Sequence, residues 1–177
     1  MFFTKVSIFV TVLATFVSCY LDNSAPYFPI EISRTATGPI AKVMFPLGVL
    51  ISCTVSIVET KRPHVPFLGF FLLALVDDKQ SWQVHMLGVL IMGLGLLREA
   101  IQNGKVLVFC LIACIYMGRL VLKAGVTYHH GYPKAILVAK EIMFTGRAES
   151  PQQLLIFKLC GLLQWVVLYG WMELYSI

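Results

Sequence analysis

Long apolar blocks separated by short polar turns fill most of the sequence, which predicts a series of membrane helices. Six blocks are expected to cross a membrane: 2–20, 40–58, 66–76, 82–97, 106–122 and 154–174. A crossing helix needs about 20 mainly apolar residues to span a hydrocarbon core of about 30 Å. The block at 66–76 is short and reaches that depth only if it tilts or recruits its flanks. The predicted fold is an all-α, polytopic bundle of six transmembrane helices that forms one domain, 1–177.

Two segments outside these blocks are also expected to be structured. The first extramembrane loop, 27–39, is predicted to be ordered and to pack onto the bundle near His85. Pro26, Pro29 and Pro39 restrict its backbone, and several of its side chains are apolar. In the longest polar stretch, 123–153, residues 135–144 are amphipathic enough to lie along the membrane interface.

Composition supports the membrane interpretation and excludes several classes of protein. Hydrophobic residues make up 58% of the chain and charged residues 13%, against about 25% charged in soluble domains. The net charge of +5 comes from scattered residues with no basic, aromatic-rich run, so no nucleic-acid partner is expected. The first block is interpreted as a transmembrane helix rather than a cleaved signal. The five cysteines lie in or beside apolar blocks, which favours free thiols over a disulfide framework.

No motif in the chain predicts an enzyme. The sequence has no G-x-S-x-G, no H-E-x-x-H, no phosphate-binding loop and no potassium-filter motif. Carboxylates inside the predicted helices, which proton-coupled carriers usually need, are also missing. We therefore expect no catalytic residue, no cofactor and no ion-coupled transport.

Ionisable residues inside membrane helices are functional candidates because they are costly to bury. Lys42, Arg119 and Lys158 lie within about a turn of a predicted helix end, so they are expected to extend to the headgroups. His85 is interpreted as a hydrogen-bonded histidine at a helix end, in preference to a metal ligand or proton relay. His129-His130 is an adjacent pair, which rarely chelates one ion, and no metal is assigned to it.

A stripe of small residues is predicted to be a helix-packing surface. Cys110, Cys114 and Gly118 recur at intervals of four within 106–122, which places them on one helix face. Small residues let a neighbouring membrane helix approach closely. We therefore expect another helix to pack there.

Three segments together resemble one known family. The loop Ile32 to Pro39, with Ser33 and Thr35, resembles the I-S-D-T-G-x-x-P-P-E motif of the damage-regulated autophagy modulator (DRAM) family. The stretch from His85 to Gly88 is similar to the V-H-D-x-G-A segment of that family. The segment that contains Gln164 and Trp165 is similar to the C-E-W stretch of the family. Most acidic positions of the family are replaced here: Arg34, Met86 and Gln164 stand where the family has carboxylates.

The resemblance implies cytoplasmic termini and a first loop that faces the lumen or exterior. It also implies a non-enzymatic DRAM-like protein that organises lipids or recruits other membrane proteins in an endomembrane or the plasma membrane. The alternative is a structural membrane subunit of a larger assembly, such as a membrane complex or the internal membrane of a virion. The loss of the acidic positions favours a structural subunit, whereas the retained I-S-x-T loop favours a DRAM-like protein.

Overall fold

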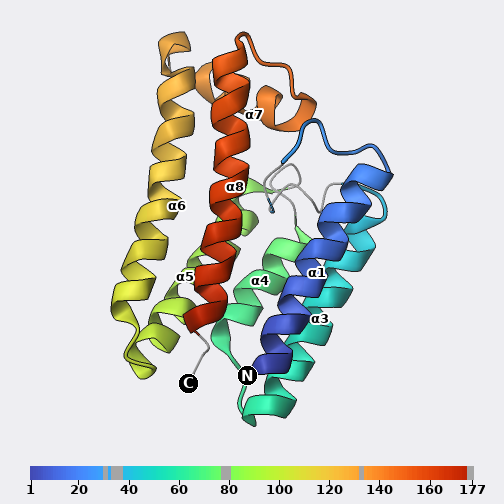
Figure 1. The fold of residues 1–177 in the computed structure, drawn as a ribbon, viewed down its shortest axis with the longest axis vertical. Helices are drawn as coiled ribbons and strands as arrows, with labels where there is room; N and C mark the ends of the chain where they lie inside the picture. Colours follow the sequence, from blue (N-terminus) through green and yellow to red (C-terminus); the bar gives the residue numbers. More distant parts are fainter. Residues whose placement is uncertain (30–31, 33–37, 77–80, 132–133, 175–177) are drawn as a thin grey trace.

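The computed structural model describes residues 1–29, 32, 38–76, 81–131 and 134–174, with only the backbone described at Trp82. Nearly all of this part is helical (Figure 1). The elements are α1 (Phe2–Leu21), α3 (Ala41–Thr60), α4 (Val65–Leu75), α5 (Trp82–Gln102), α6 (Val106–Thr127), the short 3-10 helix η1 (Tyr128–His130), α7 (Lys134–Thr145) and α8 (Pro151–Leu174). The all-α prediction is confirmed for the described residues.

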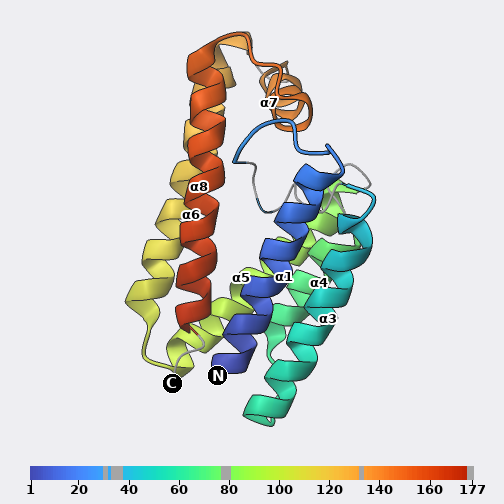
Figure 2. The same ribbon diagram turned by 45° about the vertical axis from the view of Figure 1, so that its right-hand side comes forward.

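Six of the described helices pack as three antiparallel pairs. α1 lies against α3, α4 against α5, and α6 against α8, as both ribbon views show (Figures 1 and 2). The amino terminus and the end of α8 lie at the same end of the bundle. α7, which lies between η1 and α8 in the chain, is at the opposite end of the bundle, beside the adjoining ends of α6 and α8.

A backbone-to-backbone approach brings α4 and α5 together. A Cβ atom added to Gly69 would overlap the main-chain nitrogen of Met92, and one added to Gly88 would lie 3.1 Å from the carbonyl oxygen of Gly69. The same helices meet again where Gly95 lies against Pro66. Small residues in these positions allow close van der Waals packing, which is a main source of helix association in lipid.

Polar contacts also connect neighbouring helices. Ser7 of α1 and Ser52 of α3 share a hydrogen bond of 2.8 Å between their hydroxyl oxygens. At the terminal end, Glu59 accepts hydrogen bonds from the backbone and the hydroxyl of Thr4, at 2.9 and 2.7 Å, and pairs with the amino terminus at 3.1 Å. These contacts fix the register of α1 against α3.

Five described helices are long and apolar enough to cross a membrane: α1, α3, α5, α6 and α8. α4 has 11 residues and falls short of that length. The sixth crossing is therefore still a prediction. The predicted end of 82–97 was wrong, because α5 continues to Gln102 and its charged residue Glu99 faces the protein interior, 4% exposed.

The predictions for the extramembrane segments are answered in part. Ser33 and Thr35 lie outside the described residues. Tyr27 and Ile32 are buried, as expected of a loop that packs onto the bundle. Phe28 is 65% exposed, but its ring centroid lies 6.0 Å from that of Phe16 and 5.6 Å from that of Tyr20, both on α1. The segment predicted to be amphipathic does form a helix, α7; its position along an interface stays a prediction.

Candidate functional site

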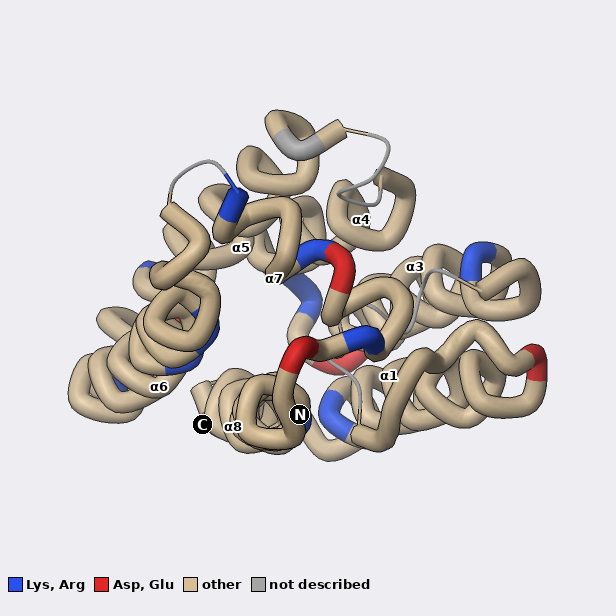
Figure 3. Tube along the Cα trace, turned by 90° about the horizontal axis from the view of Figure 1, so that it is seen from above, with Lys and Arg blue, Asp and Glu red and all other residues tan. Residues whose placement is uncertain are grey.

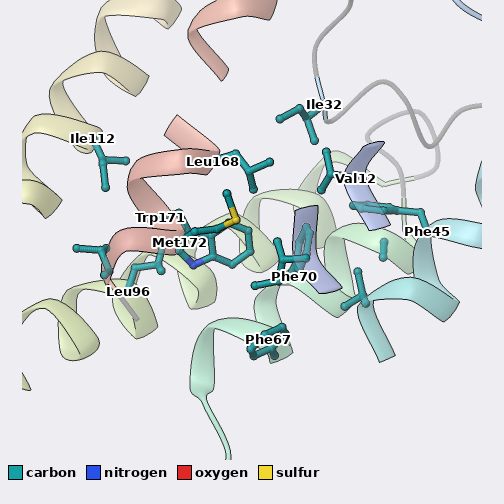
Figure 4. Close-up of a cluster of buried hydrophobic side chains, with 14 of the residues drawn as sticks. Val12, Ile32, Phe45, Phe67, Phe70, Leu96, Ile112, Leu168, Trp171 and Met172 are labelled. Atoms are coloured by element: carbon teal, nitrogen blue, oxygen red, sulfur yellow. The ribbon is translucent and has the colours of Figure 1, made fainter. Parts of the chain in front are cut away.

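A cavity of about 130 Å³ lies among the helices of the bundle. An edge-to-face series of rings forms part of its wall: the centroids of Phe45 and Phe70 are 5.3 Å apart, and those of Phe70 and Trp171 are 4.8 Å apart (Figure 4). Other lining residues are Ile32, Leu73, His85, Val89, Met92, Tyr116, Gln164, Val167 and Leu168. The lining is mostly apolar, so the cavity suits an apolar group better than water alone.

Three polar side chains in this wall come from three helices. His85 on α5 donates a long hydrogen bond, 3.4 Å from Nδ1 to the carbonyl oxygen of Val76, in agreement with its predicted role as a hydrogen-bonded histidine. Tyr116 on α6 has the guanidinium carbon of Arg119 4.7 Å from its ring centroid. Gln164 on α8 has a buried carboxamide oxygen to which no described residue donates a hydrogen bond.

Gln164 lines the cavity, and its buried carboxamide oxygen lacks a donor among the described residues. Leaving a buried carbonyl without a donor costs about 1–3 kcal/mol. If the Gln164 side chain turns its oxygen toward the cavity, a hydroxyl placed there would remove that cost. The site therefore combines a mostly apolar wall with a few polar side chains, which is the usual composition of a small-molecule site.

The volume limits what the cavity can hold. An engineered cavity of about 150 Å³ binds benzene, whereas pockets that enclose drug-sized ligands measure about 300–1,000 Å³. At about 130 Å³ the cavity accommodates a group of the size of benzene. It therefore fits one part of a membrane lipid and not a whole lipid.

Three of the family-motif residues meet at this cavity. Ile32 from the loop, His85 from α5 and Gln164 from α8 all line it, although they are far apart in the sequence. Two others have structural roles: Gly88 contacts α4, and the ring of Trp165 lies 5.2 Å from that of Phe16 on α1, centroid to centroid. Pro39 is exposed immediately before α3 and does not line the cavity.

The predicted packing stripe on α6 does not pack against the described part of this chain. Cys110 and Cys114 are exposed, and a Cβ atom added to Gly118 would meet no described atom within 4 Å. The prediction of a neighbouring helix on this face was therefore wrong for the helices that the structure describes. The physical reason is that α6 meets α8 on another face, where Gly170 of α8 lies against Ile112.

Two basic residues of α6 face the protein interior. Arg119 is 3% exposed, so the expectation that it extends to the headgroups was wrong. Lys123, one turn later, is 8% exposed, and its ammonium nitrogen lies 5.6 Å from the ring centroid of Phe157 on α8. Figure 3, which looks down on the bundle from above, shows that Lys, Arg, Asp and Glu positions are few and scattered along the chain.

A buried polar cluster at the terminal end was missed by sequence reasoning. His64, just before α4, places Nδ1 2.9 Å from Oε1 of Glu99 and Nε2 3.0 Å from the hydroxyl of Thr60. Arg62 lies 3.6 Å from the other oxygen of Glu99. The predicted block 82–97 ends before Glu99, although the continuation of helical periodicity beyond residue 97 indicates an inward-facing residue.

By the length and composition of its helices, the chain is a multi-pass α-helical membrane protein. No protein-family model, no curated protein and no solved structure matches it. These comparisons add no support for the resemblance to the DRAM family, which stays a prediction.

Proposed function

We propose that the chain is a non-enzymatic membrane protein of DRAM-like type that organises lipids by holding the hydroxyl-bearing part of one lipid in its cavity. The observation that carries the proposal is the buried carboxamide oxygen of Gln164, which lacks a donor among the described residues in an otherwise mostly apolar site. A lipid hydroxyl supplies the donor, and the adjoining hydrocarbon fits the aromatic wall. The membrane would be an endomembrane or the plasma membrane.

Adjacent valines on α8 provide a matched test. Val167 lines the cavity, whereas Val166 is 51% exposed. The purified protein is placed in phosphatidylcholine vesicles that contain a photoreactive sterol with a free hydroxyl. Val167→Phe is expected to reduce crosslinking at least three-fold because the larger side chain fills the cavity. Val166→Phe is expected to leave crosslinking unchanged.

Gln164→Leu separates the contribution of the polar group to lipid binding from that of the cavity volume. This variant keeps the cavity nearly the same size and removes the acceptor, so crosslinking should fall while thermal stability is kept or increased. Equal crosslinking in the parent and in both the Val167 and the Gln164 variants would refute lipid binding in the cavity. A crosslink located on the outer face of α6 would refute it as well.

A structural subunit of a larger assembly is the second candidate. The observation in its favour is the small-residue face of α6, formed by Cys110, Cys114 and Gly118, which points away from the other described helices. A partner helix from another chain could approach closely there. If the chain is a structural subunit, native mass spectrometry from mild detergent would reveal a stoichiometric partner. If it is a lipid-organising protein, the same measurement would reveal a free chain.

A further inference from the structure

Two histidines and a glutamate lie together at the end of the bundle opposite the termini. His129 and His130 belong to η1, and Glu149 lies just before α8. Oε2 of Glu149 is 3.0 Å from Nε2 of His130 and 3.5 Å from Nε2 of His129. One potential ligand atom from each of the three side chains lies within 4.8 Å of the others. The three side chains therefore converge on one small volume.

We propose that His129, His130 and Glu149 bind one divalent transition-metal ion of the zinc type. Zinc takes imidazole nitrogen and carboxylate oxygen at about 2.0–2.2 Å, so neighbouring ligand atoms in a tetrahedral site are roughly 3.3 Å apart. The two contacts of Glu149 lie on either side of that value. Two imidazoles and one carboxylate are a known three-ligand set for zinc and leave the fourth position for water. Imidazole ligands disfavour calcium and magnesium, which prefer oxygen.

Hydrogen bonds hold the two parts of the site together without a metal. Gln153, which is 6% exposed, donates from Nε2 to the carbonyl oxygen of Val126 at 3.1 Å. Its carboxamide oxygen accepts from the backbone nitrogen of Glu149 at 3.0 Å. One buried side chain thus connects the end of α6 to the residue that supplies the carboxylate. The spacing between the histidines and Glu149 is therefore set by the fold.

Exposure allows an ion to enter the site and the ligands to adjust. The side chains of His129 and Glu149 are 59% and 56% exposed, whereas that of His130 is 19% exposed. The less exposed imidazole provides a fixed ligand, and the other two can rotate to complete the coordination. A bound ion would join the end of α6 to the start of α8 and so close the segment of chain that contains α7 into a loop. Neither histidine indicates this site in the sequence, because Glu149 is 19 residues from His130.

Cobalt and zinc binding to the detergent-purified full chain would test the proposal. The parent protein carries Cys110→Ser and Cys114→Ser, because two exposed thiols one turn apart could bind these ions themselves, and it carries no histidine tag. We expect one Zn²⁺ per chain by equilibrium dialysis. We also expect Co²⁺ to give the visible absorption of a tetrahedral complex without thiolate charge-transfer bands, and Zn²⁺ to abolish it.

Single substitutions assign the ligands. His130→Asn and Glu149→Gln are each expected to weaken Zn²⁺ binding at least ten-fold. Glu141→Gln is the matched control, because Glu141 is an exposed carboxylate on α7 that lies outside the cluster, and it should bind as the parent does. Melting temperatures without metal show whether each variant is folded. If His130→Asn fails to fold, the more exposed His129→Asn replaces it.

The proposal is overturned if the parent binds no Zn²⁺, in which case the three residues form only ion pairs. It is also overturned if folded variants of His129 and Glu149 bind Zn²⁺ as tightly as the parent. Failure here leaves the lipid proposal intact, because the residues that line the cavity do not overlap with this cluster.

Discussion

Adding one methyl group at Gly69 tests the packing of α4 on α5. The new Cβ atom would lie 2.5 Å from the carbonyl oxygen of Gly88 and would overlap the main-chain nitrogen of Met92. Ordinary contacts between nonbonded atoms are about 3.5–4.0 Å. Both obstructing atoms belong to the backbone, so a side-chain rotation cannot relieve the overlap, and the helices must separate by about 1 Å.

Overpacking of this kind typically costs about 1–3 kcal/mol. We therefore expect Gly69→Ala to lower the free energy of unfolding by about 2 kcal/mol. Gly118→Ala on α6 is the matched control, because its added methyl group meets no described atom within 4 Å. That substitution should leave stability unchanged or raise it by up to about 1 kcal/mol, since alanine is the better helix former.

Unfolding of both variants by titration with a denaturing detergent would measure the difference. Equal stability of Gly69→Ala and the parent would refute the close crossing of α4 and α5. A larger loss in Gly118→Ala than in Gly69→Ala would show instead that the α6 stripe is the important packing surface.

Two further substitutions test polar contacts in the same unfolding assay. Ser52→Ala removes the hydrogen bond to Ser7 and should cost about 0.6 kcal/mol, the average for such bonds between membrane helices; an unchanged midpoint would show that the bond contributes nothing. Glu99→Gln removes the charge that faces His64 and Arg62 and should cost about 1–3 kcal/mol, and a stabilised variant would contradict the view that the cluster holds α4 to α5.

The helices were largely predictable because hydrophobic blocks carry most of the information in a membrane protein. The predicted block 2–20 became α1 (Phe2–Leu21), and 106–122 became α6 (Val106–Thr127) with a longer end. Apolar length determines where a helix can exist in lipid. It does not determine which face of that helix meets a neighbour.

Helix pairing could not be predicted for that reason. The stripe at Cys110, Cys114 and Gly118 has the regular spacing of a packing motif and yet points outward. The close approach uses Gly69 and Gly88, one from each helix, so no spacing within a single helix reveals it. Small-residue motifs show where close packing is possible, and the pairing of whole helices decides where it occurs.

The cavity was predictable only as separate pieces. Ile32, His85 and Gln164 were singled out through the family resemblance, but nothing in the sequence showed that they line one space. Tyr116 was not singled out, because an aromatic residue in a membrane helix usually indicates packing. A site assembled from several helices depends on long-range contacts, which a single sequence does not supply.

The direction of the helices provides an argument for the sixth crossing. Glu99, near the end of α5, contacts His64 just after α3, so α3 and α5 both finish at the terminal end of the bundle. Both ribbon views show the two helices running in the same direction (Figures 1 and 2). If each of them crosses the membrane, the chain between them must return across it. α4 rises only about 16 Å over its 11 residues, so its flanks would have to contribute to that return.

Cysteine labelling tests this topology with two positions. In a variant without the native cysteines, Lys61→Cys lies between α3 and α4, and Lys105→Cys lies between α5 and α6. With a crossing at α4, a membrane-impermeant maleimide should label both positions from the same face of a sealed vesicle. Tyr128→Cys, beyond the far end of α6 and 77% exposed, should be labelled only from the opposite face.

If α4 does not cross, α5 carries the chain to the other side, and Lys61→Cys and Lys105→Cys would be labelled from opposite faces. That result would exclude six crossings and would require α3 and α5 to be antiparallel in the membrane.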